Sequence, residues 1–372
     1  MNIRVPYYYK DFKCIADKCT DTCCAGWDVD VDKKSADYYK NVTGEFGDRI
    51  KSVMVMHEDG EAHFTLKDNG WCPFLNDRLL CDLYTELGEE HLCDTCAYFP
   101  RFIEEYGATR EIGLAFSCIT AGELMLKDDT PVTFENTEDG KPVSAYNDID
   151  PQLYFFLQGS RKKSYDVARN RNKSINDRYS ECLFYADELQ KCIKKKKYTE
   201  LMPVSCEAIK AEKGIKRKTL SEYWNIFDKL EVINKNWNVC VSDVKRYLYE
   251  NADDDCYYAY YEEFDRYYAD RQYEYEHFLM YCLYRYFLKA VNDRDVLSKV
   301  KIAIVGFLMI KELDVARFVR NGKTLSKEEQ VDIMHLYSRE VEHSYENFEM
   351  LTGIFAKDKA FETKKLLMIL ND

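Results

Sequence analysis

Nine of the 15 cysteines in this 372-residue chain lie at or before position 118, and this cluster constrains the fold more than any other feature of the sequence. Thiols gathered in this way are explained by disulfide bonds, by metal binding or by catalysis. The nine are Cys14, Cys19, Cys23, Cys24, Cys72, Cys81, Cys93, Cys96 and Cys118. Metal binding is the best of the three explanations, because the rest of the sequence argues against disulfides.

The sequence lacks the features of an exported or membrane protein. No basic amino-terminal segment leads into an apolar run. No apolar stretch reaches the length of about 18 residues that a membrane helix needs. We therefore expect a cytoplasmic protein with no membrane partner, in a reducing compartment that leaves thiols free to bind metal or to act as nucleophiles.

The charge balance bears on the choice of partner. The chain has 66 acidic and 53 basic residues, which gives a net charge of −13. This excess of acid disfavours nonspecific binding to phosphate, so we expect no nucleic-acid partner. It is compatible with a cationic partner, such as a lysine side chain presented by another protein.

The two halves of the chain differ in kind. A chain of 372 residues exceeds what one hydrophobic core usually serves, so we expect two domains, 1–150 and 151–372. No proline follows Pro203, and such a scarcity of helix breakers indicates helices. Apolar residues from Tyr275 to Tyr286 recur at helical spacing, and a second buried helix is expected near residues 300–313.

The amino-terminal part has shorter patterns. Residues 61–67 alternate apolar and polar side chains, and Asn69 and Gly70 then supply turn chemistry, which predicts a β-hairpin over 61–75. Short strands are also expected at 110–116 and 131–134. The predicted fold is therefore mainly α, with a cysteine-rich, metal-binding α+β domain that contains a short hairpin, followed by a helical bundle.

Sites made of cysteine alone select zinc or an iron–sulfur cluster, and the spacing does not decide between these two. The pair at Cys93 and Cys96 serves either. Adjacent Cys23 and Cys24 are awkward ligands for one metal, because neighbouring side chains point apart in an extended chain. One of them could serve a second site or simply pack. The radical pattern C-x3-C-x2-C is absent, since Gly26 stands where its last cysteine would be.

Several segments have distinctive local sequences. They include Cys-x-Asp-Thr-Cys-Cys-Ala-Gly-Trp at 19–27, Cys-Pro-Phe-Leu at 72–75, Tyr-Arg-Tyr-Phe at 284–287 and Tyr-Ser-Arg-Glu-Val-Glu-His-Ser at 337–344. In these segments the chain resembles the flagellin lysine N-methylase (FliB) family. The amino-terminal part also resembles the broader CxxCxxCC zinc- or iron-chelating group. One departure is at Cys118, which is followed by Ile-Thr where the family tends to have Pro-Glu, so local geometry there is in question.

The resemblance implies transfer of a methyl group from S-adenosylmethionine to lysine ε-amines of flagellin or another protein. It further implies a [4Fe–4S] cluster bound by the cysteines, with zinc possible instead of the cluster or beside it. The sequence contains no G-x-G, so the glycine-rich loop of Rossmann-type nucleotide binding is missing. We hypothesise that the methyl donor binds another way, for example by coordinating an iron with an open position.

The best catalytic candidates lie in the segment 337–347. Read as one helix, it places Tyr337, Glu340, Ser344 and Asn347 on one face, with His343 three residues from Glu340 and able to interact with it. An acid, an imidazole and a phenol can orient a lysine amine and help it lose a proton. We therefore predict catalytic roles for Tyr337, Glu340 and His343.

Other candidates are weaker. Arg285 could pair with a carboxylate of the methyl donor, while Trp27 is expected to shield the metal from water. The tyrosine-rich run 257–268 is expected to be core or rim, in preference to a methyl-lysine cage. Two rival interpretations remain open: a structural metal-binding interaction module, and a redox or iron-handling protein in which Cys23 and Cys24 act directly.

Overall fold

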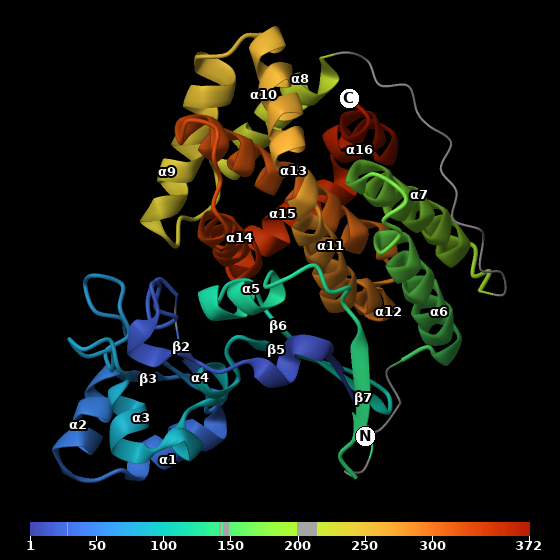
Figure 1. The fold of residues 1–372 in the computed structure, drawn as a ribbon. Coiled ribbons are helices and arrows are strands. Elements are labelled where there is room, and N and C mark those ends of the chain that lie inside the picture. Colours follow the sequence, from blue (N-terminus) through green and yellow to red (C-terminus); the bar gives the residue numbers. More distant parts are fainter. Residues whose placement is uncertain (28, 141–142, 144–148, 199–213) are drawn as a thin grey trace.

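Helices make up most of the chain, and the described strands all lie before residue 139 (Figure 1). The structure is a computed structural model that describes residues 1–27, 29–140, 143, 149–198 and 214–372. It confirms the expected mainly α fold with an α+β amino-terminal part. Among the described helices, none has both the length and the apolar character needed to cross a bilayer.

Residues 29–96 form a small unit with its own hydrophobic core, at the lower left of Figure 1. Its three short strands pair antiparallel in the order β2-β4-β3, with Val29 opposite Phe64 and Met54 opposite the same residue. Aromatic and aliphatic side chains fill the space between sheet and helices. The elements are β2 (Val29–Val31), α1 (Lys33–Asn41), α2 (Gly44–Val53), β3 (Met54–Met56), β4 (Ala62–Phe64), α3 (Asp82–Leu87) and α4 (Asp94–Tyr98).

A second sheet joins the amino terminus to the helical half. Its strand order is β5-β6-β1-β7, in which only the β1–β6 pair is parallel. Buried Glu111 of this sheet forms an ion pair of 2.7 Å with Arg161 of the first long helix, and the hydroxyl of Tyr284 donates to the Arg4 carbonyl at 2.6 Å. The strands are β1 (Asn2–Pro6), β5 (Arg101–Tyr106), β6 (Thr109–Leu114) and β7 (Phe134–Glu138).

The helical half is built around α13 (Val296–Arg320), most of which is buried. Apolar residues surround nearly its whole circumference, which is the pattern of a helix enclosed by others. The other α-helices from residue 119 onward are α5 (Ile119–Met125), α6 (Pro151–Ala168), α7 (Ile175–Lys194), α8 (Ile215–Phe227), α9 (Lys235–Val244), α10 (Asp254–Tyr267), α11 (Tyr273–Tyr286), α12 (Ala290–Asp293), α14 (Lys327–Glu342), α15 (Tyr345–Lys357) and α16 (Thr363–Leu370).

Tyrosines bridge these helices through buried carboxylates. Glu312 of α13 accepts hydrogen bonds from the hydroxyls of Tyr257 and Tyr261, each at 2.6 Å, and from the Trp224 indole at 3.0 Å. A buried charge is tolerated only when such donors satisfy it. The tyrosine-rich run 257–268 is therefore core in part, as predicted, and its hydroxyls hold the bundle together.

Several local predictions are confirmed and others are wrong in detail. The expected helices appear as α11 and α13, and the strand expected at 110–116 appears as β6. The hairpin over 61–75 is wrong, because β4 pairs with β3 and β2 instead of with the segment after Gly70. The predicted strand at 131–134 is shifted to β7. The domain limits 1–150 and 151–372 stay a prediction, and residues 141–142 and 144–148 beside that boundary lie outside the described residues.

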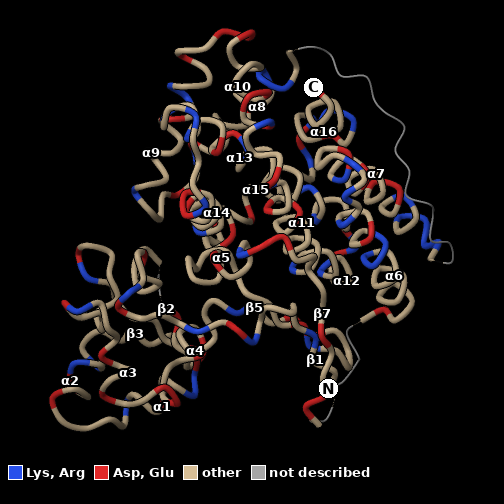
Figure 2. Tube along the Cα trace, in the orientation of Figure 1, with Lys and Arg blue, Asp and Glu red and all other residues tan. Residues whose placement is uncertain are grey.

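Charged residues of both signs are interspersed along the two halves of the chain (Figure 2). Many of them pair on the surface, as Arg320 does with Asp243 at 2.6 Å and Arg49 with Asp82 at 2.7 Å. Such exposed pairs contribute little to stability individually. The pairs that matter for the site are buried ones, and they gather around α14.

Candidate functional site

The loop that carries the vicinal cysteines, residues 19–27, docks against α14 through Asp21. The Asp21 carboxylate accepts hydrogen bonds from His335 Nε2 at 2.7 Å, from Arg339 Nη1 at 2.6 Å and from the Asn234 amide at 3.1 Å. His335 and Arg339 are one helical turn apart on α14, so both reach the same acceptor. This cluster joins the start of the chain to its last third.

Arg339 also contacts the main chain of the loop. Its guanidinium donates to the Ala25 carbonyl at 2.5 Å and lies 4.4 Å from the Trp27 ring centre. Gly26 between them has a φ of +87°, and a Cβ there would stand 2.9 Å from the Ile233 side chain. Glycine is therefore required at position 26 both by backbone conformation and by close approach.

Charge stabilises this docking. Although burial alone would raise it, hydrogen bonding to His335 and the positive charge of Arg339 hold the pKa of Asp21 below its ordinary value. Asp21 is 25% exposed and Arg339 only 2%, so the arginine is the deeply buried partner. A buried arginine needs such a partner, because an unpaired charge is costly in the interior.

His343 sits at the junction beside the same loop. Its ring stacks on Trp27 with centres 5.2 Å apart and meets Phe99 edge-on at 5.6 Å. Burial, together with the nearby charges of Arg285 and Arg339, lowers the pKa of His343 to about 3. The imidazole is therefore neutral at neutral pH, and its buried Nε2 has no hydrogen-bond partner among the described residues.

The segment 337–347 is not one helix, which corrects the expected face. α14 ends at Glu342, and Ser344 caps the next helix by accepting from the Asn347 N–H. Glu340 points to the loop before α9, where it accepts from the N–H groups of Ile233 at 2.9 Å and Asn234 at 2.6 Å. Burial raises the pKa of Glu340 to about 7 despite these two donors.

The three predicted catalytic residues therefore do not share one surface. Tyr337 is 1% exposed and packs among Phe227, Trp237 and Phe278. Glu340 faces the loop before α9 and His343 faces Trp27, so the expected contact between them is not formed. His343 is the one of the three that lies against the cysteine-bearing loop.

The buried carboxylate of Glu342 connects residues 284–287 and 337–344, the two carboxyl-terminal segments that carry the family resemblance. It accepts hydrogen bonds from the hydroxyls of Tyr281 and Tyr286, each at 2.7 Å, and also from Ser338. Arg285 lies 3.5 Å from the same carboxylate and donates to Tyr281. Arg285, predicted to bind a donor carboxylate, thus already has an internal anionic partner.

None of the nine amino-terminal cysteines forms a disulfide in the structure, since all are among the free thiols of the described chain. They nevertheless lie near one another in two sets. Within the described residues, no three His, Cys, Asp or Glu side chains converge tightly enough to hold one metal ion. The thiols within each set are neighbours, but they do not meet at a single point.

The outer set consists of Cys14, Cys19, Cys23 and Cys118. Burial raises the pKa of Cys118 to about 11, and the thiols of Cys19 and Cys14 are close enough to raise it further. Cys23 lies near Cys14 and Cys118 in the same way. Cys14 and Cys23 are exposed to solvent, so this set opens to the surface.

The inner set consists of Cys24, Cys72, Cys81, Cys93 and Cys96, all in or against the core of the small unit. Burial raises the pKa of Cys72 to about 12, and neighbouring Cys24, Cys81 and Cys93 add to that shift. A hydrogen bond between the vicinal thiols lowers the pKa of Cys24 to about 7 and raises that of Cys23. The vicinal pair therefore connects the two sets.

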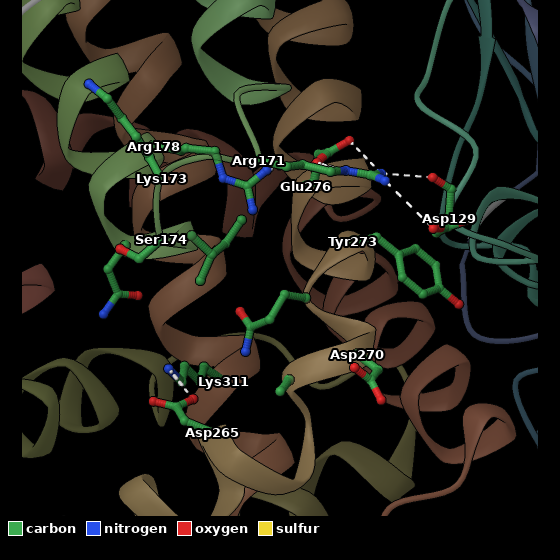
Figure 3. A pocket seen from close by; sticks show the side chains of 14 residues that line it. Asp129, Arg171, Lys173, Ser174, Arg178, Asp265, Asp270, Tyr273, Glu276 and Lys311 are labelled. Carbon is green, nitrogen blue, oxygen red and sulfur yellow. Dashed lines mark hydrogen bonds and ion pairs between the residues drawn. The ribbon is translucent and has the colours of Figure 1, made fainter.

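A cavity of about 470 Å³ lies elsewhere, on the side of the helical half (Figure 3). Charged side chains line part of its wall, and several of them are paired: Glu276 binds Arg171 at 2.8 Å and Arg178 at 2.6 Å, and Lys311 binds Asp265 at 2.7 Å. A charged ligand would have to compete with these pairs. Glu276, which the sequence placed at the start of a helix that could face a cleft, lines this cavity, whereas Tyr337, Glu340, His343 and Arg285 do not.

Sequence reasoning missed four residues that organise the junction. Asp21 stood in a quoted motif between two cysteines, and Arg339 and Glu342 stood in another, but none was singled out. His335 precedes Arg339 by four residues, and two basic side chains at this helical spacing could have indicated a shared acidic partner. Glu342 could be found only by knowing that Tyr281 and Tyr286 lie opposite it.

This protein combines a cysteine-rich amino-terminal part with an α-helical bundle, and one helix of the bundle, α14, holds the cysteine-bearing loop. The model of the FliB lysine N-methylase C-terminal domain matches residues 161–369, more than half of the chain, and the chain belongs to this family. The match includes α14, with His335, Arg339 and Glu342. The recognised domain thus contains the helix that holds the cysteine loop.

Curated relatives are similar over a shorter stretch of 139 residues, at 23% identity. The flagellar biosynthetic protein FliU of Salmonella muenchen matches over 34% of this chain and 79% of its own length. The lysine-N-methylases of Salmonella choleraesuis and Salmonella typhimurium match over 34% of this chain and only 33% of theirs. The match therefore spans a third of those methylases. No solved structure matches the chain.

Proposed function

We propose that this protein is an iron–sulfur-dependent protein lysine N-methyltransferase that uses S-adenosylmethionine. Its acceptor is a lysine ε-amine of a flagellar protein, with flagellin the first candidate, since relatives bear the names lysine-N-methylase and flagellar biosynthetic protein. The reaction joins a methyl carbon to a neutral amine nitrogen, breaks the bond between that carbon and the donor sulfur, and releases the ammonium proton to solvent.

One observation carries the proposal: three segments of the family resemblance, far apart in sequence, meet at α14. Asp21 of the cysteine loop pairs with Arg339, and Arg285 of α11 pairs with Glu342, one turn further along the same helix. Residues that must act together are expected to converge in this manner even when distant in sequence. A helical partner-docking module would not need a buried polar junction beside its thiols.

A cluster and a lone zinc ion need their ligand thiols at different separations. Zinc draws its ligand sulfurs to about 2.3 Å from one centre, whereas the thiolates of an iron–sulfur cluster are held apart by the inorganic core. Within the described residues, no three of these side chains are placed to hold one metal ion, so the arrangement by itself favours neither centre. A cluster bound there would supply an electropositive iron face at which a methyl donor could be held.

Main-chain groups around the thiols support ligation. Cys118 accepts from the N–H groups of Thr120 and Ala121, and Cys81 from those of Leu83 and Tyr84. Hydrogen bonds from N–H favour the charged thiolate over the neutral thiol. Such donors are the surroundings that ligating sulfurs usually have.

His343 is the group that we assign to the acceptor lysine. With a pKa of about 3, it cannot take a proton from a lysine ammonium whose ordinary pKa is about 10.4, so it is not the base. Its unpartnered Nε2 can instead accept a hydrogen bond from the amine and hold the lone pair toward the methyl carbon. Trp27 beside it already carries the Arg339 guanidinium at 4.4 Å and the His343 ring at 5.2 Å, so it encloses the junction.

Glu340 and Tyr337 support the segments that surround the site. Glu340 fixes the loop that begins α9 through two backbone N–H groups, and Asn234 of that loop in turn contacts Asp21. Tyr337 supports α14 from the core. Their direct participation in the reaction stays a prediction.

The test is methyl transfer by the full chain purified without oxygen. Protein reconstituted with iron and sulfide is incubated with methyl-labelled S-adenosylmethionine and flagellin, and methyl-lysine is measured by mass spectrometry. His343→Phe keeps the stacking on Trp27 and is expected to lower kcat by about tenfold, the worth of one well-placed hydrogen bond. His57→Phe is the control, because exposed His57 contacts His63 at 2.8 Å and lies away from both the junction and the cysteines in sequence.

Iron-loaded protein that transfers no methyl group to flagellin or to lysine-containing proteins of a flagellated cell would overturn the proposal. Equal loss of activity in both histidine variants would overturn the role of His343. Transfer to a protein other than flagellin would keep the reaction and change the acceptor.

A further inference from the structure

The edge strand β5 has a row of backbone groups without partners. It is the outermost strand of its sheet, where it pairs with β6 alone among the described strands. Pro100 accepts from the Ala115 N–H at 2.9 Å, and hydrogen-bonded pairs alternate along an antiparallel ladder. The N–H and C=O groups of Arg101, Ile103 and Glu105 therefore point away from β6. None of these groups has a hydrogen-bond partner among the described residues.

The features that usually protect an edge strand are weak in β5. Natural sheets protect such edges with lysine, proline, bulges or very short strands. β5 spans six residues, contains neither lysine nor proline, and presents Ile103 at 38% exposure. Its two glutamates are already paired, Glu104 with Lys289 and Glu105 with Arg110, each at 2.5 Å. β5 is therefore an edge at which another extended chain can pair.

The strand begins beside the junction that holds His343. Phe99 precedes Arg101 by two residues, and its ring centre lies 5.5 Å from that of Trp27 and 5.6 Å from that of His343. An extended chain advances about 3.3 Å per residue, so a chain paired with Arg101 reaches the level of Phe99 within about two residues. Pairing with β5 thus carries a lysine of the added chain toward the imidazole assigned above to the acceptor.

The charge of the neighbouring small unit bears on which chain can pair. Residues 29–96 contain 15 acidic and seven basic residues, a net charge of −8 out of −13 for the whole chain. α4, the last element of this unit, ends at Tyr98, directly before Phe99. A chain that runs past Phe99 enters these acidic surroundings, which favour a basic segment. A second copy of this chain would instead bring two acidic units together.

We propose that β5 is the docking site for the acceptor protein, which adds an extended, lysine-rich segment to this edge as a further strand. Main-chain hydrogen bonds to Arg101, Ile103 and Glu105 hold the segment, and the acidic small unit selects basic residues in it. The inference rests on the proposed function only in that the occupant presents a lysine to His343. The acceptor is thereby recognised by its conformation and charge more than by a fixed sequence.

The first test needs no substitution. Full-length chain purified without oxygen is incubated with a peptide of about ten residues that alternates threonine and lysine, and hydrogen–deuterium exchange is followed. The amides of Arg101, Ile103 and Glu105 should exchange fast in the free chain and slowly with the peptide, whereas those of Phe102 and Glu104 are already bonded to β6. A peptide with glutamate in place of lysine should bind at least about tenfold more weakly.

A second test changes the edge itself. Ile103→Pro removes the outward N–H at position 103 and leaves the bonds to β6, because an edge strand tolerates proline at such a position. One lost main-chain hydrogen bond corresponds to roughly fivefold weaker binding of the lysine peptide and a similar rise in KM for flagellin. Asn136→Pro is the matched control, since Asn136 faces outward from β7 on the opposite edge of the same sheet. It should leave both values as in the wild type.

Unchanged exchange at β5, equal binding of the lysine and glutamate peptides, or equal effects of the two proline variants would overturn the docking site. Slow exchange at β5 in the free chain, together with a concentration-dependent dimer, would overturn it in favour of a second copy. If Ile103→Pro does not fold, exchange in the wild-type chain still decides.

The binding test is independent of methyl transfer, because it needs neither iron nor S-adenosylmethionine. A chain that binds the lysine peptide at β5 and methylates nothing would overturn the proposed function alone. An active transferase whose KM for flagellin is the same in the wild type and in Ile103→Pro would overturn this inference alone.

Discussion

Replacing Arg339 by methionine should release the cysteine-bearing loop from α14. Methionine keeps much of the side-chain volume but removes the charge, and with it the contacts of 2.6 Å to Asp21 and 2.5 Å to the Ala25 carbonyl. Breaking one side of a buried ion pair costs about 3–5 kcal/mol. Asp21 is 25% exposed and keeps its bond to His335, so we expect the lower end of that range.

The loss should be visible both locally and globally. A change of about 3 kcal/mol corresponds to a fall of roughly 4 °C in the unfolding temperature, because an unfolding entropy of about 2 cal/mol/K per residue sums to about 0.8 kcal/mol/K over 372 residues. Hydrogen–deuterium exchange should rise in residues 19–27 and in the first part of α9, where Asn234 contacts the same carboxylate. Exchange in the core helix α13 should stay as in the wild type.

Arg320→Met is the matched control, because Arg320 pairs with Asp243 at 2.6 Å but is 31% exposed. An exposed pair of this kind contributes only about 0–1 kcal/mol. If Arg339→Met and Arg320→Met show the same unfolding temperature and the same exchange in residues 19–27, the docking described for α14 is refuted.

Three further predictions concern single groups at the junction. Gly26→Ala should destabilise the protein by more than about 2 kcal/mol, because it adds a contact of 2.9 Å to the cost of about 1–2 kcal/mol for a positive φ. Gly70→Ala is the control, because Gly70 has a φ of +77° and open space around it. In denaturant unfolding this control should lose only the cost of about 1–2 kcal/mol for the positive φ. His343 has a lowered pKa of about 3, so stability should fall by up to about 4 kcal/mol as pH drops from 6.5 to 3, and His343→Phe should flatten that part of the profile. Glu340 has a raised pKa of about 7, so its contribution should decline by about 3 kcal/mol as pH rises from 4.5 to 7; an unfolding profile of Glu340→Gln that keeps the wild-type slope there would contradict this assignment.

The helical half was predictable because its signals are local. The spacing of Tyr275 to Tyr286 and the absence of proline after Pro203 fix helices by themselves. The break between α14 and α15 was missed because the residues around His343 are polar and carry no breaker. Only Ser344, which caps α15 through the Asn347 N–H, marks the boundary.

The strands and the junction were less accessible, because both depend on contacts between distant residues. Phe64 pairs with Val29 and Met54, so β4 could not be assigned a partner from its own sequence. Asp21 and Arg339 are 318 positions apart. The cysteine pattern predicted thiols gathered in space, but their separation into two sets depends on how the main chain turns between Cys23 and Cys24.

Arg339 binds carbonyl oxygens of the 19–27 loop, so the identity of the side chain at Ala25 is of little importance for docking. Variation among homologues should therefore be uneven within one short motif. Position 25 should accept many residues, whereas an acid at 21 and glycine at 26 should persist wherever a helix carries histidine and arginine four residues apart. A lineage that lost the acid should have lost both basic residues with it, and this paired loss could be used to trace which distant homologues retain the same junction.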